Sequence, residues 1–419
     1  MSAHFDDQEI RDPQARETDL FARLAAHLPK AVSFSAGLAN HLKGCDLAAV
    51  TDRQSLAALP VLRKPELMAA QAANPPFGGF ANLDELAGNR IFLSPGPIWE
   101  PQGIGADPWL GARALFAAGF RYGDVVINSL AYHMTPGGFI LDEALRALGC
   151  SVFPAGIGNT EMQVEAAVAL QPAAYTGTPD YLKVILDKAQ EMDADLSCIK
   201  RALVSGGALF PSMREDYASR GVQVLQAYAT ADLGVIAYES LHGGELVDGM
   251  MVNEDLIVEI VRPGTDDPVA EGEVGELVVT NFSTSYPLVR FGTGDLSAVL
   301  PGSSPCGRTN GRIKGWMGRA DQRTKVKGMF VDPKQIAELV KRFDEVSAAR
   351  LVVERQGDRD AMRLQVTAAD HGDGDGDGID VDQVAASLRD LTKLGGSVEV
   401  VDALPNDGKV ISDERDYDS

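Results

Sequence analysis

The stretch from residue 120 to 232 alternates short apolar runs with longer segments in which apolar and polar residues mix. Short apolar runs bounded by turn residues are typical of buried strands, and the longer segments have helical length. Because strand and helix alternate at this spacing, we predict a mainly parallel, doubly wound sheet. The predicted strands are 124–130, 150–156, 172–177, 201–207 and 222–229, and the predicted helices are 137–149, 160–170, 178–192 and 211–221.

Two of these helices carry start signals in the sequence. Thr160 followed by Gln163 has the spacing of a capping box, in which each side chain bonds the backbone N–H of the other residue. Thr178 before Pro179 has the residue types that favour an N-cap and the first helical position. We expect one helix to begin at each of these sites.

The unusual residues of this stretch gather where its predicted strands end. In open parallel sheets, ligands bind beyond the carboxyl ends of the strands. We therefore expect a single crevice at that edge. Its expected borders are Tyr132 and His133, residues 156–159 and 176–178, the turn Ser205-Gly206-Gly207, and residues 228–232.

The pattern changes on both sides of this stretch. Residues 1–89 read as helix pieces ended by Pro and Gly. Residues 250–300 alternate apolar and polar positions, which is typical of antiparallel strands or a small barrel. The chain after Gly318 reads as a small α+β domain. We predict an α/β protein with a large N-terminal domain, residues 1–320, that includes a small β-rich subdomain, and a small C-terminal domain, residues 321–419.

Charge and cysteine content narrow the function classes. The chain has 38 basic and 60 acidic residues, a net charge of −22 and a pI near 4.6. This balance argues against broad binding to nucleic acid or to an anionic membrane. Its four cysteines form no CxxC pair, so we expect neither a zinc framework nor a disulfide scaffold. Without a signal-peptide core or a long apolar run, we expect a cytoplasmic protein.

Two segments carry candidate nucleotide chemistry. In QAYATADLG (226–234), Tyr228 could stack on a base and Asp232 could hold a divalent cation. The alternative is a packed tyrosine and a helix-capping aspartate. In LVRFGTGDLSAV (288–299), Asp295 follows a glycine turn and could accept two ribose hydroxyls. An ordinary hairpin turn is the alternative there.

Two later segments carry positive charge. Residues 306–328 hold seven basic residues and one acid, although the chain as a whole is acidic. Such a segment can receive polyphosphate or another anion, and the alternative is a solvated basic hairpin. In LPNDGKV (404–410), a turn presents Lys409 near the end of the chain. By itself this segment favours an ordinary surface lysine, because surface lysines are common, and a catalytic lysine is the alternative.

Taken in this order, the segments resemble the adenylate-forming superfamily, and within it the phenylacetate–CoA ligase-like branch, from about residue 55 to 412. The matching stretches are LPVLRKPEL (59–67), GIGNTEMQ (156–163), YPLVRFGTGDL (286–296), PCGRTNGRI (305–313) and MGRADQRTKVKGMFVDPKQI (317–336). The resemblance implies a small mobile C-terminal domain. It also implies an enzyme that joins a carboxylic acid to AMP from ATP, releases pyrophosphate, and then passes the acyl group to coenzyme A.

The resemblance also implies residue roles. Lys409 would approach the α-phosphate, Asp232 would help hold Mg²⁺, and Asp321 would be the hinge of domain rotation. His133 would stand beside the acyl site, where related enzymes carry a gating ring. The implied nucleotide-binding residues are Ser94, Ser205, Gly206, Gly207, Gln226, Tyr228, Ala229, Thr230, Asp295 and Arg319; those of the acyl pocket are Tyr132, His133, Gly207 and Ile236; those on the coenzyme A side are Lys325, Lys327 and Gly328.

The chain departs from the family pattern at three places. Some relatives carry a Cys/His zinc site, of which only Cys306 with His242 remains suggestive here, and we expect no zinc. The family's Y-G-x-T-E is here Tyr228-Ala229-Thr230-Ala231-Asp232, which loses a hydroxyl and shortens the acid. The segment IFLSPGPIWEPQG (91–103) has three prolines where the family has a Ser/Thr/Gly-rich phosphate loop beginning at Ser94. Because proline has no N–H, the loop has fewer backbone donors for phosphate.

The leading hypothesis is an ATP-dependent acid–CoA ligase for an aromatic or arylacetic acid, using ATP, Mg²⁺ and coenzyme A. One alternative is an adenylate-forming enzyme with a different acceptor. The other is a nucleotide-binding homologue without turnover. The resemblance further implies a homodimer, with small molecules rather than nucleic acid or membrane as partners.

Overall fold

A computed structural model describes residues 3–94, 97–320, 322, 324–327, 329–356, 359–369 and 378–415. The chain divides into two compact units. The first consists of residues 1–258, 278–293 and 299–315, and the second of residues 259–277, 294–298 and 316–419. The second unit thus takes in two short segments upstream of its main stretch, which begins at Trp316.

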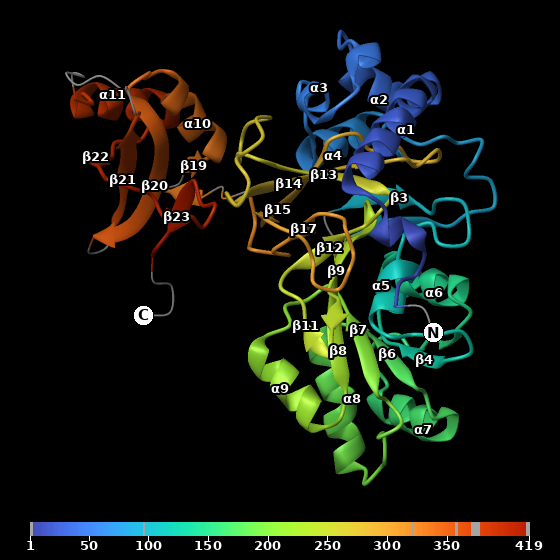
Figure 1. The fold of residues 1–419 in the computed structure, drawn as a ribbon. Coiled ribbons are helices and arrows are strands. Elements are labelled where there is room, and N and C mark those ends of the chain that lie inside the picture. The colour runs from blue at the N-terminus through green and yellow to red at the C-terminus, as the bar shows by residue number, and fades with distance from the viewer. Residues whose placement is uncertain are drawn as a thin grey trace. The chain divides into compact units, whose positions relative to one another are not determined.

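A parallel sheet forms the centre of the first unit (Figure 1). Its strands lie in the order β5-β4-β6-β7-β8, and each neighbouring pair is parallel. This confirms the predicted mixed α/β character and the parallel pairing. The bounds are β4 Val125–Asn128, β5 Ser151–Phe153, β6 Ala174–Gly177, β7 Arg201–Val204 and β8 Gln223–Thr230.

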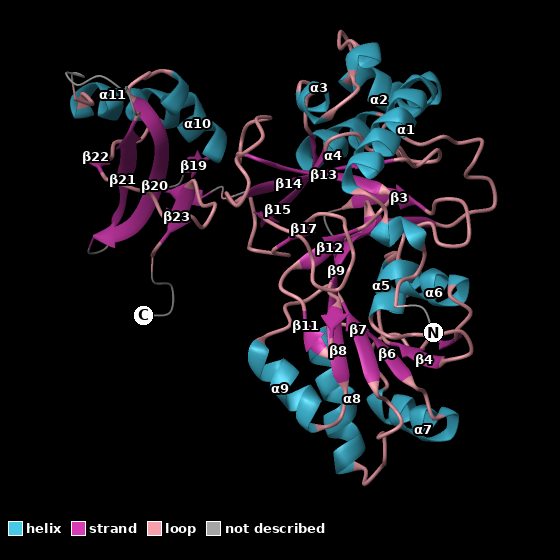
Figure 2. Cartoon of the chain, viewed as in Figure 1, coloured by secondary structure: helices cyan, strands magenta, loops and turns pink. Residues whose placement is uncertain are grey.

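Helices cover both faces of this sheet (Figure 2). Val126 packs in one core cluster with α5 and α6, and the next residue, Ile127, packs in another with α7, α8 and α9. Ala174 and Tyr175 divide between the two clusters in the same way, because successive side chains of a strand point to opposite faces. The helices are α5 Ala112–Ala117, α6 Gly137–Ala147, α7 Thr160–Leu170, α8 Pro179–Glu191 and α9 Pro211–Ser219.

The two predicted helix starts differ in outcome. Helix α7 begins at Thr160, but its N-cap is Asn159 in the left-handed region and no side chain caps it. Gln163 instead donates to the carbonyls of Ala155 (3.1 Å) and Gly156 (2.9 Å), so the predicted capping box is wrong. Helix α8 begins as predicted, with Thr178 at the N-cap and proline at the first position.

Antiparallel strands extend the sheet beyond β8, in the order β8-β9-β12-β17-β16. Their bounds are β9 Gly234–Tyr238, β12 Met250–Val252, β16 Val299–Leu300 and β17 Arg312–Ile313, and a small hairpin pairs β10 Leu241–His242 with β11 Glu245–Leu246. A separate four-stranded sheet has the order β1-β15-β14-β13, with bounds Leu62–Arg63, Phe291–Ser297, Gly275–Asn281 and Leu256–Val261. Strands β13 and β14 are buried along their whole length, which the predicted alternation did not anticipate.

The N-terminal part is helical and leads into a hairpin. Its helices are η1 Asp7–Ile10, α1 Pro13–Phe34, α2 Ala36–His41, η2 Leu47–Ala49, α3 Arg53–Ala57 and α4 Lys64–Ala73. The hairpin pairs β2 Ile91–Ser94 with β3 Ile98–Pro101 and contains the proline-rich segment. Two residues of its turn, Pro95 and Gly96, lie outside the described residues.

The main stretch of the second unit has its own sheet and core. The strand order is β22-β21-β20-β23, and helices α10 and α11 pack on the sheet through one hydrophobic cluster. The bounds are β18 Thr324–Val326, β19 Met329–Val331, α10 Pro333–Lys341, β20 Val346–Gln356, β21 Arg359–Ala368, α11 Val381–Thr392, β22 Ser397–Val400 and β23 Ile411–Asp413. Among all described residues, no helix is both long and apolar enough to cross a membrane.

Candidate functional site

A cavity of about 170 Å³ opens at the carboxyl ends of the parallel strands. One wall is apolar and comes from the end of β4 and the start of α6. The other wall comes from the turn after β7 and from the end of β8. The lining residues are Leu130, Thr135, Pro136, Gly137, Ile140 and Leu141 on the first wall, and Ser205, Gly206, Ala229, Thr230 and Ala231 on the second.

The turn Ser205-Gly206-Gly207 is held from two sides. Ser205 N–H donates to the carbonyl of Gly177 at the end of β6 (3.0 Å), and Gly206 has φ +73°, a conformation that favours glycine. The Gln226 side chain on β8 donates to the carbonyl of Gly207 (2.9 Å). The structure therefore brings these four predicted nucleotide-binding residues together.

The second half of β8 carries the predicted base-stacking residue. Tyr228 lies opposite Ala237 of β9, and the pairing shifts register between Tyr228 and Ala229. Tyr228 is buried and Ile236 on β9 is fully buried; neither belongs to the lining of the cavity. Their predicted roles at the adenine and at the acyl group stay predictions.

The side chain of Tyr132 contacts helix α6 through both its hydroxyl and its ring. Its hydroxyl accepts from Asn128 Nδ2 (2.6 Å) and donates to Asp142 Oδ2 (2.8 Å), and its ring meets Phe139 edge-on at 5.1 Å. Burial and the bond to Asp142 raise the pKa of Tyr132 well above its usual range. His133 follows it and is exposed. Neither Tyr132 nor His133 lines the cavity, although Leu130 and Thr135 on either side of them do.

A buried polar cluster lies beside the end of the β8 strand. Lys64 Nζ, at the start of α4, lies 2.9 Å from Asp232 Oδ2. Glu100 on β3 accepts a hydrogen bond from the Ser94 hydroxyl (2.9 Å). Burial, followed by the negative charge of Asp232, raises the pKa of Glu100 to about 9. The first residue of the expected phosphate loop and the expected metal ligand thus belong to one cluster.

This cluster suits a divalent cation that also binds phosphate. When Glu100 is protonated, its carboxyl hydrogen-bonds Asp232. When both groups are ionised, Asp232 Oδ1 and Glu100 Oε2 are buried oxygens without a hydrogen-bond donor among the described residues. Mg²⁺ commonly takes one or two protein carboxylates and completes its shell with phosphates and water. No group of three or more His, Cys, Asp or Glu side chains suited to a metal occurs in the part of the chain that the structure describes. Cys306 instead lies against hydroxyls, with Ser304 Oγ at 3.0 Å.

In the second unit, the two predicted ribose-side residues meet. Asp295 and Arg319 form a β-bridge, and the Arg319 guanidinium donates to Asp295 Oδ1 (3.0 Å). Trp316 Nε1 donates to the same oxygen (3.2 Å). Gly294 has φ +75°, and a Cβ there would lie 2.8 Å from the Arg319 guanidinium. The glycine before Asp295 therefore makes room for the arginine.

The turn that carries Lys409 is tied down within the same unit. Gln322 donates to the carbonyl of Gly408 (2.7 Å) and accepts from the N–H of Ile411 (2.7 Å). Asp407 accepts from the N–H of Lys409 (3.0 Å). Lys409 itself is exposed. Its ammonium is thus presented by a fixed turn.

Several predicted residues lie beyond what the structure describes. Asp321 and Gly328 are outside the described residues, and so is the side chain of Lys325. Lys327 is exposed, has φ +47°, and donates its backbone N–H to Asp360 (2.9 Å). The hinge and the coenzyme A contacts therefore stay predictions.

Sequence reasoning missed Lys64, Glu100 and the wall formed by α6. Lys64 lies within LPVLRKPEL, which supported the family resemblance, but nothing along the chain relates it to Asp232. The wall had a readable signal, since Gly137 begins an amphipathic helix directly after a strand end.

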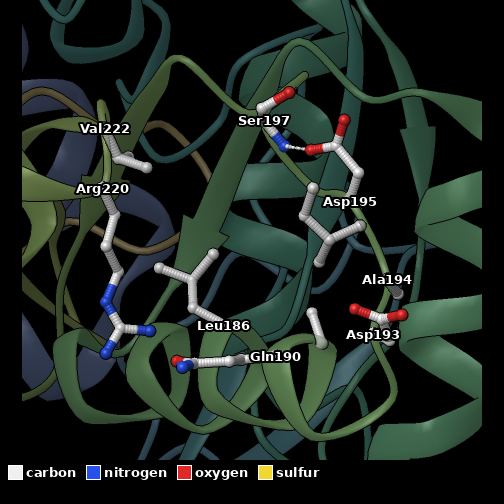
Figure 3. Close-up of a pocket in the computed structure, with 10 residues that line it drawn as sticks. Leu186, Gln190, Asp193, Ala194, Asp195, Ser197, Arg220 and Val222 are labelled. Atoms are coloured by element: carbon white, nitrogen blue, oxygen red, sulfur yellow. Dashed lines mark hydrogen bonds between the residues drawn. The ribbon is translucent and has the colours of Figure 1, made fainter.

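A second hollow, of about 420 Å³, lies at the opposite edge of the parallel strands, beside α8 (Figure 3). Its lining comes from the end of α8 and from the segments that lead into β7 and β8, including Asp195 and Arg220. Asp195 accepts from the N–H of Ser197 (2.8 Å), and Arg220 pairs with Asp187 (2.7 Å). Asp195 and Arg220 are thus engaged with neighbouring groups, and we place the candidate site at the carboxyl edge.

The curated proteins similar to this chain include phenylacetate–CoA ligases from several bacteria. The chain matches none of the protein-family models. The phenylacetate–CoA ligase of Pseudomonas putida is 31% identical over 332 residues, 76% of this chain and 73% of that protein. That of Escherichia coli (strain K12) is 31% identical over 310 residues, 70% and 69% of the two chains. That of Thermus thermophilus is 28% identical over 374 residues, 85% and 82%.

Solved structures share the fold. A 2-hydroxyisobutyryl-CoA ligase in the postadenylation state, in complex with R3-HIB-AMP, aligns with a TM-score of 0.71 and 22% identity, covering 99% of this chain and 93% of that one. The same ligase in the thioesterification state, with 2-HIB-AMP and CoA, aligns with a TM-score of 0.69 at the same coverage.

Proposed function

Because this chain belongs to the phenylacetate–CoA ligase family, we propose that it is an ATP-dependent acid–CoA ligase acting through an acyl-adenylate. One observation carries the proposal. The cavity at the strand ends joins an apolar wall from α6 to the turn at Ser205 and Gly206 and to Ala229 and Thr230 of β8. An apolar acid and a nucleotide placed there would meet at their reactive ends.

The first half-reaction gives roles to several of the predicted residues. The acid's carboxylate oxygen attacks the α-phosphorus of ATP, and pyrophosphate leaves. Lys409 would stabilise the charge that develops at the α-phosphate, and loss of such a group typically reduces the rate on the order of 10²–10³. Asp295 would bind the ribose hydroxyls, with Arg319 beside them. Asp232 and Glu100 would hold Mg²⁺, which neutralises phosphate charge when bound.

The second half-reaction transfers the acyl group. The coenzyme A thiolate attacks the acyl carbon, so that a C–S bond forms and the bond to the AMP oxygen breaks. We propose that the small domain, residues 321–419, rotates about Asp321 between the two steps. Lys325, Lys327 and Gly328 would then lie on the coenzyme A side. His133 would line the path of the acid, since it is exposed beside the cavity's Thr135.

The cavity size supports a single-ring acid. A cavity of about 150 Å³ lined by aliphatic and aromatic side chains accommodates benzene. The cavity here is of similar size, and Leu130, Ile140 and Leu141 form its apolar wall. We therefore propose an arylacetic or aromatic acid with one ring, such as phenylacetate.

An acid panel assayed for pyrophosphate and acyl-CoA tests the function. We expect pyrophosphate release to depend on a single-ring acid, and acyl-CoA to require coenzyme A. Pyrophosphate release without acyl-CoA would point to another acceptor. Absence of pyrophosphate across the panel, with ATP still bound, would point to a homologue without turnover.

A lysine substitution tests the mechanism. Lys409→Ala should suppress acyl-adenylate formation by about 10²–10³ while sparing thioester formation from supplied acyl-adenylate. The control is Lys393→Ala, which removes an exposed lysine at the end of α11. An equal loss in both half-reactions would contradict the role of Lys409.

A further inference from the structure

We propose that Lys64 is an internal counter-ion that occupies Asp232 before nucleotide binds, yields that carboxylate to the divalent cation, and then pairs with the polyphosphate of ATP. The inference rests on the nucleotide-binding part of the proposed function. It assigns roles to Lys64 and Glu100 in the nucleotide site.

Lys64 and Asp232 form an ion pair whose two members differ in exposure. Lys64 Nζ lies 2.9 Å from Asp232 Oδ2; the Lys64 side chain is 27% exposed, whereas that of Asp232 is 1% exposed. The ammonium is therefore the member of the pair that solvent and ligands reach. A cation approaching Asp232 meets this like charge first, and the repulsion between them is strong at such short range.

Hydrogen bonds connect the elements that carry the cluster. Gln71, on the same helix as Lys64, donates to the carbonyl of Trp99 (2.8 Å) and accepts from its N–H (2.8 Å). Trp99 precedes Glu100 on β3, and Glu100 is bonded to Ser94 at the end of β2. Helix α4 and the phosphate-loop hairpin are therefore fixed to each other, with Lys64 at the start of the helix.

The proline-rich hairpin has few groups that can bind phosphate. Pro97 and Pro101 have no N–H to offer a phosphate. The Ser94 hydroxyl is already bonded to Glu100, at 2.9 Å. A tetraanionic polyphosphate beside this hairpin needs a positive group. Lys64 is a partly exposed cation within the cluster.

The exchange follows from these contacts. A divalent cation that binds Asp232, with Glu100 beside it, replaces the ammonium as the counter-ion of the Asp232 carboxylate. The long, flexible lysine side chain then moves its charge to the phosphate oxygens that share the cation. The ammonium and the metal thus neutralise the polyphosphate together, which compensates for the small number of backbone N–H donors in the proline-rich loop.

Lys64→Met tests the proposal without an activity assay. We expect the variant to bind Mn²⁺ at least about tenfold more tightly in the absence of nucleotide, because the competing ammonium is gone. We expect it to bind ATP in EDTA at least about tenfold more weakly. Lys183→Met is the matched control, since it removes a lysine from a surface ion pair with Asp187 on α8 (2.7 Å). Unchanged affinity for either probe in Lys64→Met would overturn the proposal.

A footprinting experiment on the unaltered protein covers the case in which the variant does not fold. Amine acylation followed by mass spectrometry should show Lys64 more reactive when Mn²⁺ is added alone, and protected when ATP is then added. Constant reactivity of Lys64 would overturn the exchange. These readouts are independent of catalysis: if they hold while no acid supports pyrophosphate release, the proposed ligase activity fails and the counter-ion role stands.

Discussion

The size of the acyl pocket can be tested at Ile140. This residue lies on α6, is 6% exposed, and lines the cavity while packing in the core cluster on that face of the sheet. Ile140→Ala removes three carbon atoms beyond Cβ. At about 0.8 kcal/mol for each buried carbon, the transfer loss is about 2.4 kcal/mol, and the new space raises the total to about 3–5 kcal/mol.

The functional effect is a change in selectivity. The cavity of about 170 Å³ holds one ring, so the unaltered protein should prefer phenylacetate strongly over naphthylacetate. Discrimination by pocket size is typically worth about 1–3 kcal/mol. We expect Ile140→Ala to raise kcat/KM for naphthylacetate relative to phenylacetate by about 10–200-fold. Pyrophosphate release with each acid measures the ratio.

Ile185→Ala is the matched control. Ile185 is a fully buried isoleucine on α8, in the cluster on the opposite face of the sheet, and it does not line the cavity. It should lose similar stability in urea unfolding and leave the selectivity ratio unchanged. An unchanged ratio in Ile140→Ala, or the same shift in Ile185→Ala, would refute the assignment of the acyl pocket.

Three further substitutions test other parts of the structure. Burial raises the pKa of Glu100 to about 9, above its unfolded value of 4.5, so the folded state keeps a proton that the unfolded state releases and stability falls as pH rises between these values. Glu100→Gln should remove this fall in stability, which amounts to up to about 1.4 kcal/mol per pH unit. Urea unfolding of both proteins at pH 5, 7 and 9 measures it, and the same pH dependence in the variant as in the unaltered protein would contradict the prediction. Gly408 has φ +69°, and a Cβ there would clash with the Val274 side chain, so Gly408→Ala should shift the turn and slow adenylation on the order of 10–100-fold in the pyrophosphate assay. Arg16→Met removes the partner at 2.7 Å from buried Glu254, which keeps Arg11 at 3.5 Å. The variant should lose up to about 3–5 kcal/mol of stability, which thermal unfolding would detect.

The sheet was predictable because its signals are local. Each strand between residues 120 and 232 is an apolar run bounded by turn residues. The structure places a strand within four of the five predicted ranges, and β8 overlaps the fifth but ends one residue later, at Thr230. Start signals were less dependable. Thr160 had the residue types of a capping box, but the N-cap fell on Asn159 because Gln163 bonds the carbonyls of Ala155 and Gly156 instead. A competing contact with the loop before the helix overrode the capping pattern.

The candidate site was predictable only where its residues are close in sequence. The segments around Ser205, Tyr228 and Asp295 stood out because their turns need glycine or place an acid at a strand end. The cavity also needed the wall from α6, whose Ile140 reads from the sequence as an ordinary core residue. Burial and lining depend on which elements pack together, and the periodicity of a single segment does not carry that information.

The sequence by itself determined the parallel architecture and the motifs that relate this chain to its family, since both depend on short-range periodicity and spacing. Only the tertiary structure decided that Lys64, Glu100 and Asp232 form one buried cluster. These residues come from a helix start, a hairpin strand and the turn after β8. Their pairing depends on packing between distant segments, and burial there strengthens the interaction of their charges because little water remains to screen them.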